Sequence, residues 1–253
     1  MKIRVLGCHG GSLPGFSPVS LLIDEKISLD AGTLTSVLSF QEQLKISSVL
    51  LTHPHLDHFH ELAFLIDNRK VENVLSKTVT VYSTQNILQY IHSHIFNDII
   101  WPDYTKKPAP ALLELYPIEE GCSFSIEDYQ IEAVRVEHAI EAVGFIVRGQ
   151  KGTCVFSGDT KATEKLWRRA QTYSDLKAVF LELSYSERKS EWTKTAKHHS
   201  VSTFVEELKK IPEGVDVYAY HLKPQFYEEI KKELLAYRFK NVQIIQKGEV
   251  LII

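Results

Sequence analysis

The sequence predicts an α/β protein in which two β-sheets pack face to face and helices cover their outer faces. Three observations support this prediction. The 253 residues, 44% of them hydrophobic, are enough to bury a large two-layer core. Each half of the chain has successive β-rich runs and then strand–helix pairs, instead of a regular strand–helix alternation. Polar side chains that bind metals directly follow several of these runs. We therefore expect residues 1–253 to form a single domain.

The first half of the chain contains short runs rich in β-branched and apolar residues, which are typical of strands. These runs predict strands at residues 2–6, 19–23, 26–29, 47–51 and 78–82. Apolar residues at helical spacing predict helices at residues 33–43, 61–68 and 85–100, with Thr33 as the first N-cap. Trp101-Pro102 should end the third helix, because the α conformation is disfavoured before proline.

The second half begins with a run of strands and closes with alternating helices and strands. Strands are expected at residues 124–126, 129–136, 143–147, 153–156, 178–183, 215–220, 242–246 and 249–253. Helices are expected at residues 163–172, 201–210 and 225–237. Pro224 should lie in the first turn of the last helix, where proline is favoured.

The composition excludes several classes of protein. A net charge of −3 gives no support for the basic face of a protein bound to duplex nucleic acid. Cys8, Cys122 and Cys154 are far apart and lack a C-x-x-C spacing, which excludes a disulfide framework and a cysteine zinc site. The N-terminal apolar run is too short for a signal peptide, and no run is long enough to span a membrane. We expect a cytoplasmic protein with no membrane partner.

One short segment contains most of the chemical signal. Thr52-His53-Pro54-His55-Leu56-Asp57-His58 places five potential metal ligands in a loop directly after a buried strand. Ionisable groups at such a place are costly to bury without a partner. Imidazole and carboxylate together suit zinc, manganese or iron better than calcium. The segment therefore predicts a metal site.

Three further candidates each follow a predicted strand. They are His138, Asp159 and His221. Alone, each is compatible with a cap or an ordinary polar residue. Together with the four charged or imidazole side chains of residues 53–58 they make seven ligand-type residues at equivalent positions. Seven ligands suit two ions with a shared carboxylate between them.

The motif T-H-x-H-x-D-H, followed by a lone histidine, Gly158-Asp159-Thr160 and a late histidine, resembles the metallo-β-lactamase superfamily over essentially the whole chain. The resemblance implies an αββα four-layer sandwich with two divalent metal ions, zinc or alternatively manganese or iron. It implies one ion on His53, His55 and His138 and a second on Asp57, His58 and His221, with Asp159 bridging them. Asp57 is also counted among the catalytic candidates.

A narrower resemblance concerns four tracts. His55-Leu56-Asp57-His58, Ser157-Gly158-Asp159-Thr160, Leu181-Glu182-Leu183-Ser184-Tyr185 and His221-Leu222-Lys223-Pro224 are similar to class II cyclic-nucleotide phosphodiesterases. That group has an additional catalytic histidine before its penultimate helix. Alignment on the phosphodiesterase motif selects His198, whereas alignment on the related tRNA 3'-processing nucleases selects His199. Both residues are catalytic candidates.

Several other residues are candidates for secondary roles. Asn97 and Trp101 lie in a tract that also resembles the phosphodiesterase group, and Trp101 could stack on a base or pack in the core. Lys223, beside His221, could meet a phosphate oxygen. Asp30 follows a predicted strand and could either orient a ligand histidine or serve in a turn.

The expected function is that of a binuclear metal-dependent phosphodiesterase converting 3',5'-cyclic nucleotides to 5'-monophosphates. Three alternatives remain open: a tRNA 3'-end nuclease, an ester, thioester or lactam hydrolase of the same fold, and a non-catalytic metal-binding protein. A long Gly/Pro-rich arm for tRNA is not apparent, so RNA is the less favoured partner. A homodimer is a further expectation.

Overall fold

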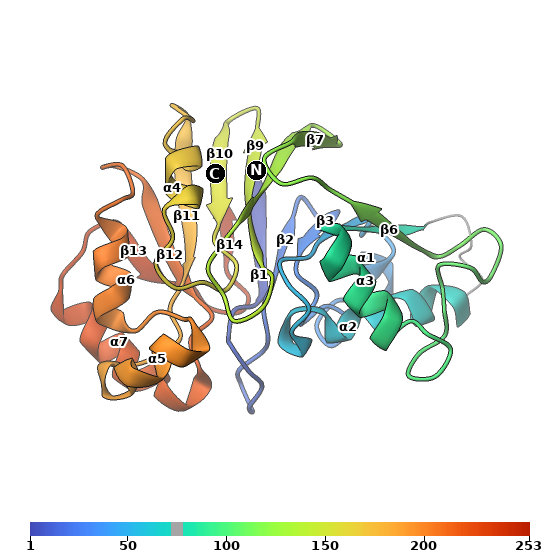
Figure 1. Ribbon diagram of the computed structural model, residues 1–253, viewed down its shortest axis with the longest axis horizontal. Helices are drawn as coiled ribbons and strands as arrows, with labels where there is room; N and C mark the ends of the chain where they lie inside the picture. Colours follow the sequence, from blue (N-terminus) through green and yellow to red (C-terminus); the bar gives the residue numbers. More distant parts are fainter. Residues whose placement is uncertain (72–77) are drawn as a thin grey trace.

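The structure is a computed structural model that describes residues 1–71 and 78–253. Two seven-stranded sheets lie at its centre, as Figure 1 shows. Helices α1 (Phe40–Gln43), α2 (Leu56–Val71) and α3 (Gln85–His94) cover the outer face of one sheet. Helices α4 (Lys165–Ala170), α6 (Val201–Leu208) and α7 (Tyr227–Ala236) cover the other, with α5 (Ser190–Ala196) below them. The expected four-layer αββα sandwich is confirmed.

The first sheet has the strand order β14-β1-β2-β3-β4-β5-β6. Its strands are β1 (Lys2–Gly7), β2 (Ser20–Ile23), β3 (Ile27–Leu29), β4 (Ser48–Leu50), β5 (Val79–Ser83), β6 (Leu113–Pro117) and β14 (Val250–Ile252). Strands β3 to β6 are parallel, and the other pairs are antiparallel. Parallel strands bring their carboxyl ends to one edge of the sheet.

The second sheet has the order β13-β12-β11-β10-β9-β8-β7. Its strands are β7 (Ser123–Ile126), β8 (Tyr129–Arg135), β9 (Val143–Gly149), β10 (Gly152–Phe156), β11 (Leu176–Glu182), β12 (Asp216–Tyr220) and β13 (Val242–Ile244). Strands β10 to β13 are parallel. Two short 3₁₀ helices, η1 (Glu187–Lys189) and η2 (Pro224–Phe226), follow β11 and β12. Pro224 begins η2, which leads into α7, and does not lie in the first turn of α7 itself, where it was expected.

Three apolar clusters hold these layers together. The central one lies between the sheets and includes a stack of Phe156, Phe180 and Tyr218, with ring centroids 4.7 and 4.9 Å apart. The other two join each sheet to its helices. Burial of this apolar surface is the main stabilising contribution. No described helix has the length and hydrophobicity needed to span a membrane.

The predicted helix over residues 33–43 is wrong in most of its length. Only α1 is helical, and Ser39, not Thr33, is its N-cap. The Thr33 hydroxyl donates to the Pro18 carbonyl at 2.7 Å instead. The Glu61 carboxylate accepts the backbone N–H groups of Leu34 and Ser36. These contacts with distant residues hold the segment in turns and override its helical spacing.

Two other helix boundaries differ from the prediction. Helix α2 begins at Leu56, five residues before the expected start, so the end of the predicted metal-binding loop is helical. Helix α3 ends at His94, well before Trp101-Pro102. The Asn97 carboxamide oxygen accepts from the backbone N–H groups of Ile99 and Ile100 at 3.0 and 2.9 Å. This local bonding competes with the helix.

Two elements were not predicted. Strand β6 is a short edge strand in which three of the five residues are exposed; its alternation of Leu113, Glu114 and Leu115 is a weak strand signal, and the strand ends at Pro117. Helix α5 is seven residues long and contains one buried residue, Thr193, so it has no apolar periodicity.

Candidate metal centre

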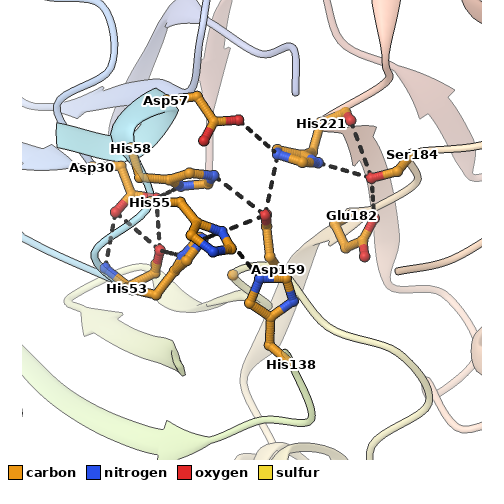
Figure 2. A network of polar contacts seen from close by, with 12 residues as sticks. Asp30, His53, His55, Asp57, His58, His138, Asp159, Glu182, Ser184 and His221 are labelled. Carbon is orange, nitrogen blue, oxygen red and sulfur yellow. Dashed lines mark hydrogen bonds and ion pairs between the residues drawn. The ribbon is translucent and has the colours of Figure 1, made fainter. Parts of the chain in front are cut away.

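Seven predicted ligand residues meet at one edge of the sandwich, as Figure 2 shows. His53 and His55 follow β4, and Asp57 and His58 lie in the first turn of α2. The remaining three follow strands of the second sheet: His138 after β8, Asp159 after β10 and His221 after β12. Both sheets therefore contribute to the cluster, and the seven side chains come together only when the two sheets pack.

Asp159 lies at the centre of the cluster. Its Oδ2 atom is 3.5 Å from His53 Nε2, 3.4 Å from His58 Nε2 and 3.2 Å from His221 Nε2. Figure 2 shows this oxygen between the three imidazoles. One carboxylate thus contacts residues from both expected triads, which is the arrangement that a bridging ligand requires.

The other side chains group around this carboxylate in two sets. In the first, His55 Nδ1 lies 3.0 Å from His53 Nε2 and 3.3 Å from His138 Nε2. In the second, His221 Nε2 lies 3.6 Å from Asp57 Oδ2. Separations of this size between potential ligand atoms are close to the distances between the ligands of one ion.

Most cluster histidines are oriented by a protein group on their other ring nitrogen. Asp30 Oδ2 lies 2.7 Å from His58 Nδ1. The Ser184 hydroxyl lies 2.8 Å from His221 Nδ1, and the Thr52 hydroxyl lies 3.0 Å from His53 Nδ1. These contacts leave the Nε2 atoms directed at Asp159. Asp30 therefore takes the orienting position, one of the two roles considered for it.

The backbone around the cluster is strained at two non-glycine residues. Asp30 and His221 have φ angles of 55° and 67°, in the left-handed region. Such strain persists where surrounding structure holds the residue in place. Gly10 packs directly on His221, and a Cβ atom on it would lie 2.5 Å from the imidazole Cε1 and 2.8 Å from the backbone oxygen. A side chain at position 10 is thereby excluded.

The donor set fits divalent metal ions. Within residues 1–71 and 78–253, the buried atoms His58 Nε2, His221 Nε2 and Asp159 Oδ1 have no hydrogen-bond partner. Buried polar atoms of native proteins are nearly always bonded, so these atoms require a ligand. Nitrogen and carboxylate donors match zinc, manganese or iron.

The protonation state of the first set of histidines also favours metal binding. Burial lowers the pKa of His138 to about 4 and lowers the pKa values of His53 and His55, so these imidazoles are neutral at pH 7. A metal ligand must present a free lone pair, and a neutral imidazole does so. Burial opposes the ionisation of Asp159, but electrostatic interactions with the imidazoles of His221, His58 and His53 and a hydrogen bond from His58 outweigh burial and lower its pKa.

Comparison with known proteins agrees with this geometry. A family profile described as "Beta-lactamase superfamily domain" matches residues 27–221. The chain belongs to the metallo-β-lactamase superfamily. The match includes all seven cluster residues, from His53 to His221.

Individual members of the superfamily are similar at low identity. The chain is 25% identical over 143 residues to 3',5'-cyclic-nucleotide phosphodiesterase 1 of Saccharomyces cerevisiae, covering 49% of this chain and 38% of the relative. It is 30% identical over 104 residues to ribonuclease Z of Bacillus subtilis, covering 41% and 31%. The chain therefore spans well under half the length of these two relatives.

The solved structure of unliganded yeast PDE1 superposes with a TM-score of 0.83 at 18% identity, covering 100% of this chain and 99% of that one. The short form of human tRNase Z gives a TM-score of 0.72 at 16% identity, covering 100% and 99%. At such identities these similarities establish the fold of the superfamily.

The two candidate catalytic histidines of this superfamily member lie in different surroundings. His198 stacks on His221 with ring centroids 5.3 Å apart and an interplanar angle of 16°. Its Nδ1 atom lies 3.0 Å from the buried Glu182 Oε1. In contrast, His199 Nδ1 lies 3.1 Å from the hydroxyl of Thr203 in α6. The structure brings His198 to the cluster and turns His199 away from it.

The three substrate candidates also separate. Trp101 packs edge-on against Phe64 of α2, with centroids 5.4 Å apart, and Asn97 bonds within its own turn, so both have structural contacts. Lys223 is half-buried and lies two residues after His221. Burial is the main cause that lowers the pKa of His221; Asp159 raises this pKa, and the charge of Lys223 lowers it. Of the three, Lys223 is the one that acts on the cluster.

Proposed function

We propose that this protein is a binuclear metal-dependent phosphodiesterase whose substrate is a 3',5'-cyclic nucleotide. The observation that supports it best is the convergence of seven metal-binding side chains, with Asp159 at their centre; three buried atoms of this set have no hydrogen-bond partner within residues 1–71 and 78–253. The family membership and the similarity to a cyclic-nucleotide phosphodiesterase and to a ribonuclease Z favour a phosphodiester substrate.

Two sets of side chains would hold the metal ions. His53, His55 and His138 form one set, and Asp57, His58 and His221 form the other; Asp159 belongs to both. Divalent ions at such sites lower the pKa of water toward neutrality and neutralise charge on phosphoryl oxygens.

The surrounding residues of the chain supply positioning and proton transfer. Asp30, Thr52 and Ser184 fix the ring orientations of His58, His53 and His221. Glu182 contacts His198 Nδ1, and within the described residues His198 Nε2 has no hydrogen-bond partner, which suits donation of a proton to the leaving alkoxide. Such general acid catalysis contributes about 10²–10⁴-fold to the rate. Lys223 would pair with a phosphoryl oxygen.

A substrate panel tests the proposal. The protein is stripped of metal with a chelator, reloaded with zinc or manganese, and assayed on bis-p-nitrophenyl phosphate, cyclic nucleotides and a tRNA precursor. The proposal expects metal-dependent hydrolysis, with cyclic nucleotides converted to 5'-monophosphates. An active metal-free wild type, or activity confined to carboxylic esters, would contradict it.

The second candidate is a tRNA 3'-end endoribonuclease, favoured by the similarity to ribonuclease Z. It predicts cleavage of the tRNA precursor and binding that weakens steeply with salt, because phosphate contacts release counterions. The net charge of −3 argues against it. Salt-dependent binding of the precursor together with inactivity on cyclic nucleotides would favour it over the cyclic-nucleotide enzyme.

A further inference from the structure

Tyr185 connects the candidate metal centre to the protein surface. It directly follows Ser184, whose hydroxyl contacts His221. The Tyr185 ring centroid lies 5.9 Å from that of His198 and 5.9 Å from that of Phe226. The half-buried ring of Tyr185 is therefore only one side chain removed from the cluster.

The ring of Tyr185 is supported on the side away from the cluster. Phe226, in η2, packs against the apolar cluster between the second sheet and its helices. The Arg188 guanidinium lies over the Phe226 ring at 5.5 Å and is also paired with Glu229 at 2.8 Å. Phe226 and Arg188 thus form a backing that limits how far Tyr185 can move from His198.

The tyrosines of the described chain differ in whether their hydroxyl is hydrogen-bonded. The hydroxyls of Tyr104, Tyr129 and Tyr173 each donate to a carboxylate, as expected of tyrosines that are buried or half-buried. In the part of the chain that the structure describes, the Tyr185 hydroxyl has no hydrogen-bond partner. The partly exposed ring and its free hydroxyl are available to a ligand.

A lysine follows the strand next to the one that precedes Tyr185. The Lys223 backbone N–H donates to the Ser184 carbonyl at 3.1 Å, so Lys223 and Tyr185 flank the same residue at the ends of neighbouring strands β12 and β11. Within residues 1–71 and 78–253, Lys223 forms no ion pair. A ligand with an anionic group for Lys223 and a planar group for Tyr185, joined by a short linker, would match this pair of side chains.

We infer that Tyr185 is a specificity-determining residue that binds the planar base of a nucleotide while Lys223 pairs with its phosphate. This inference rests on the proposed phosphodiesterase function and extends it to the base. Stacking of a base on an aromatic side chain tolerates any base, because every base has a π-face. The wall formed by Tyr185 and Phe226 therefore selects for the presence of a base and not for its identity.

Calorimetric binding of two product-like ligands to the zinc-loaded protein tests the inference without relying on turnover. Adenosine 5'-monophosphate and ribose 5-phosphate share the phosphate and the sugar, and only the first has a base. We expect the wild type to bind the nucleotide about tenfold more tightly, within the range of one base–aromatic stack. The Tyr185→Leu variant should lose this preference and keep its affinity for ribose 5-phosphate. Tyr185→Phe should keep the preference.

Tyr237→Leu is the matched control. Tyr237 is a partly exposed tyrosine at the far end of α7, stacked on Phe239 with centroids 5.6 Å apart. This variant should keep the wild-type preference. If Tyr185→Leu does not fold, Tyr185→Trp decides, since a larger ring should strengthen nucleotide binding relative to ribose 5-phosphate.

The outcomes separate this inference from the proposed function. A wild type that binds both ligands equally, or a Tyr185→Leu variant that keeps the preference, overturns the inference. A preference that depends on Tyr185, in a protein that hydrolyses no phosphodiester, supports the base-binding wall and refutes the phosphodiesterase. An unchanged ratio of affinities in Tyr185→Trp counts against the wall.

Discussion

Replacing Asp30 with asparagine should weaken metal binding without disturbing the backbone. The Asp30 carboxylate accepts from three buried donors: Thr52 N at 2.9 Å, the Thr52 hydroxyl at 2.9 Å and His58 Nδ1 at 2.7 Å. Asparagine has the same shape and tolerates the left-handed φ of 55° found here. The substitution therefore tests the effect of replacing one carboxylate oxygen of Asp30 with an NH₂ group.

The size of the effect follows from the hydrogen bonds. The amide of asparagine must direct its NH₂ group either at Thr52 or at His58, and each of these already donates to Asp30. One buried donor is left without an acceptor, at a cost of about 1–3 kcal/mol. This corresponds to a loss of about 5- to 150-fold in metal affinity if the cost falls on His58. Loss of a residue that orients a metal ligand typically costs about 10–100-fold.

The assay is competition for zinc between the protein and a chromophoric chelator, with bound metal checked by elemental analysis. Asp24→Asn is the matched control, because Asp24 also has a left-handed φ, 44°, and accepts from the Lys2 N–H and the Tyr129 hydroxyl away from the cluster. Its zinc affinity should equal that of the wild type. An Asp30→Asn variant that binds zinc as tightly as the wild type would refute the reasoning.

Other predictions concern proton transfer, a buried loop contact and the core. His198→Ala should lower kcat on bis-p-nitrophenyl phosphate by about 10²–10⁴-fold with normal metal content, whereas His199→Ala should retain most activity; equal losses in both would contradict their different placement. Glu61→Leu should lower the free energy of unfolding in urea by about 1–3 kcal/mol at pH 7, because it removes the carboxylate oxygen, Oε2, that accepts two backbone N–H groups. Burial opposes ionisation of Glu61, but these hydrogen bonds outweigh it and lower the pKa, so its contribution is present above the unfolded value of about 4.3 and is lost as the pH falls below it. The variant should show a flatter acid dependence, and an unchanged acid dependence would argue against the contact. Phe180→Ala should cost about 3–5 kcal/mol in the same assay, since the ring is fully buried between two aromatic rings; a loss below about 1 kcal/mol would show that the core repacks.

Much of the fold could be predicted because its signals are local. Runs of apolar and β-branched residues predicted thirteen of the fourteen strands in the described part of the chain, and the glycine-rich first loop was placed between the first two. The exceptions show where local signals fail. Residues 33–38 have helical spacing, but Glu61 and Pro18 hold them in turns. Strand β6 alternates apolar and polar residues over only three positions, and its pairing with β5 at the sheet edge decides that it is a strand.

The sequence by itself determined which chemistry is available. Seven histidine and aspartate residues after strand-like runs indicate metal ligands, because burying so many ionisable groups without a bound ion costs free energy. Which groups support them was decided by tertiary structure. Ser184 reaches His221 from 37 positions away, and Glu182 selects His198 over its neighbour His199. The sequence motifs could not distinguish His198 from His199, because the two histidines are adjacent. Only the packing of β11 beside β12 directs one imidazole to the cluster and the other to α6, because the hydrogen-bond partners that orient the two rings come from different elements.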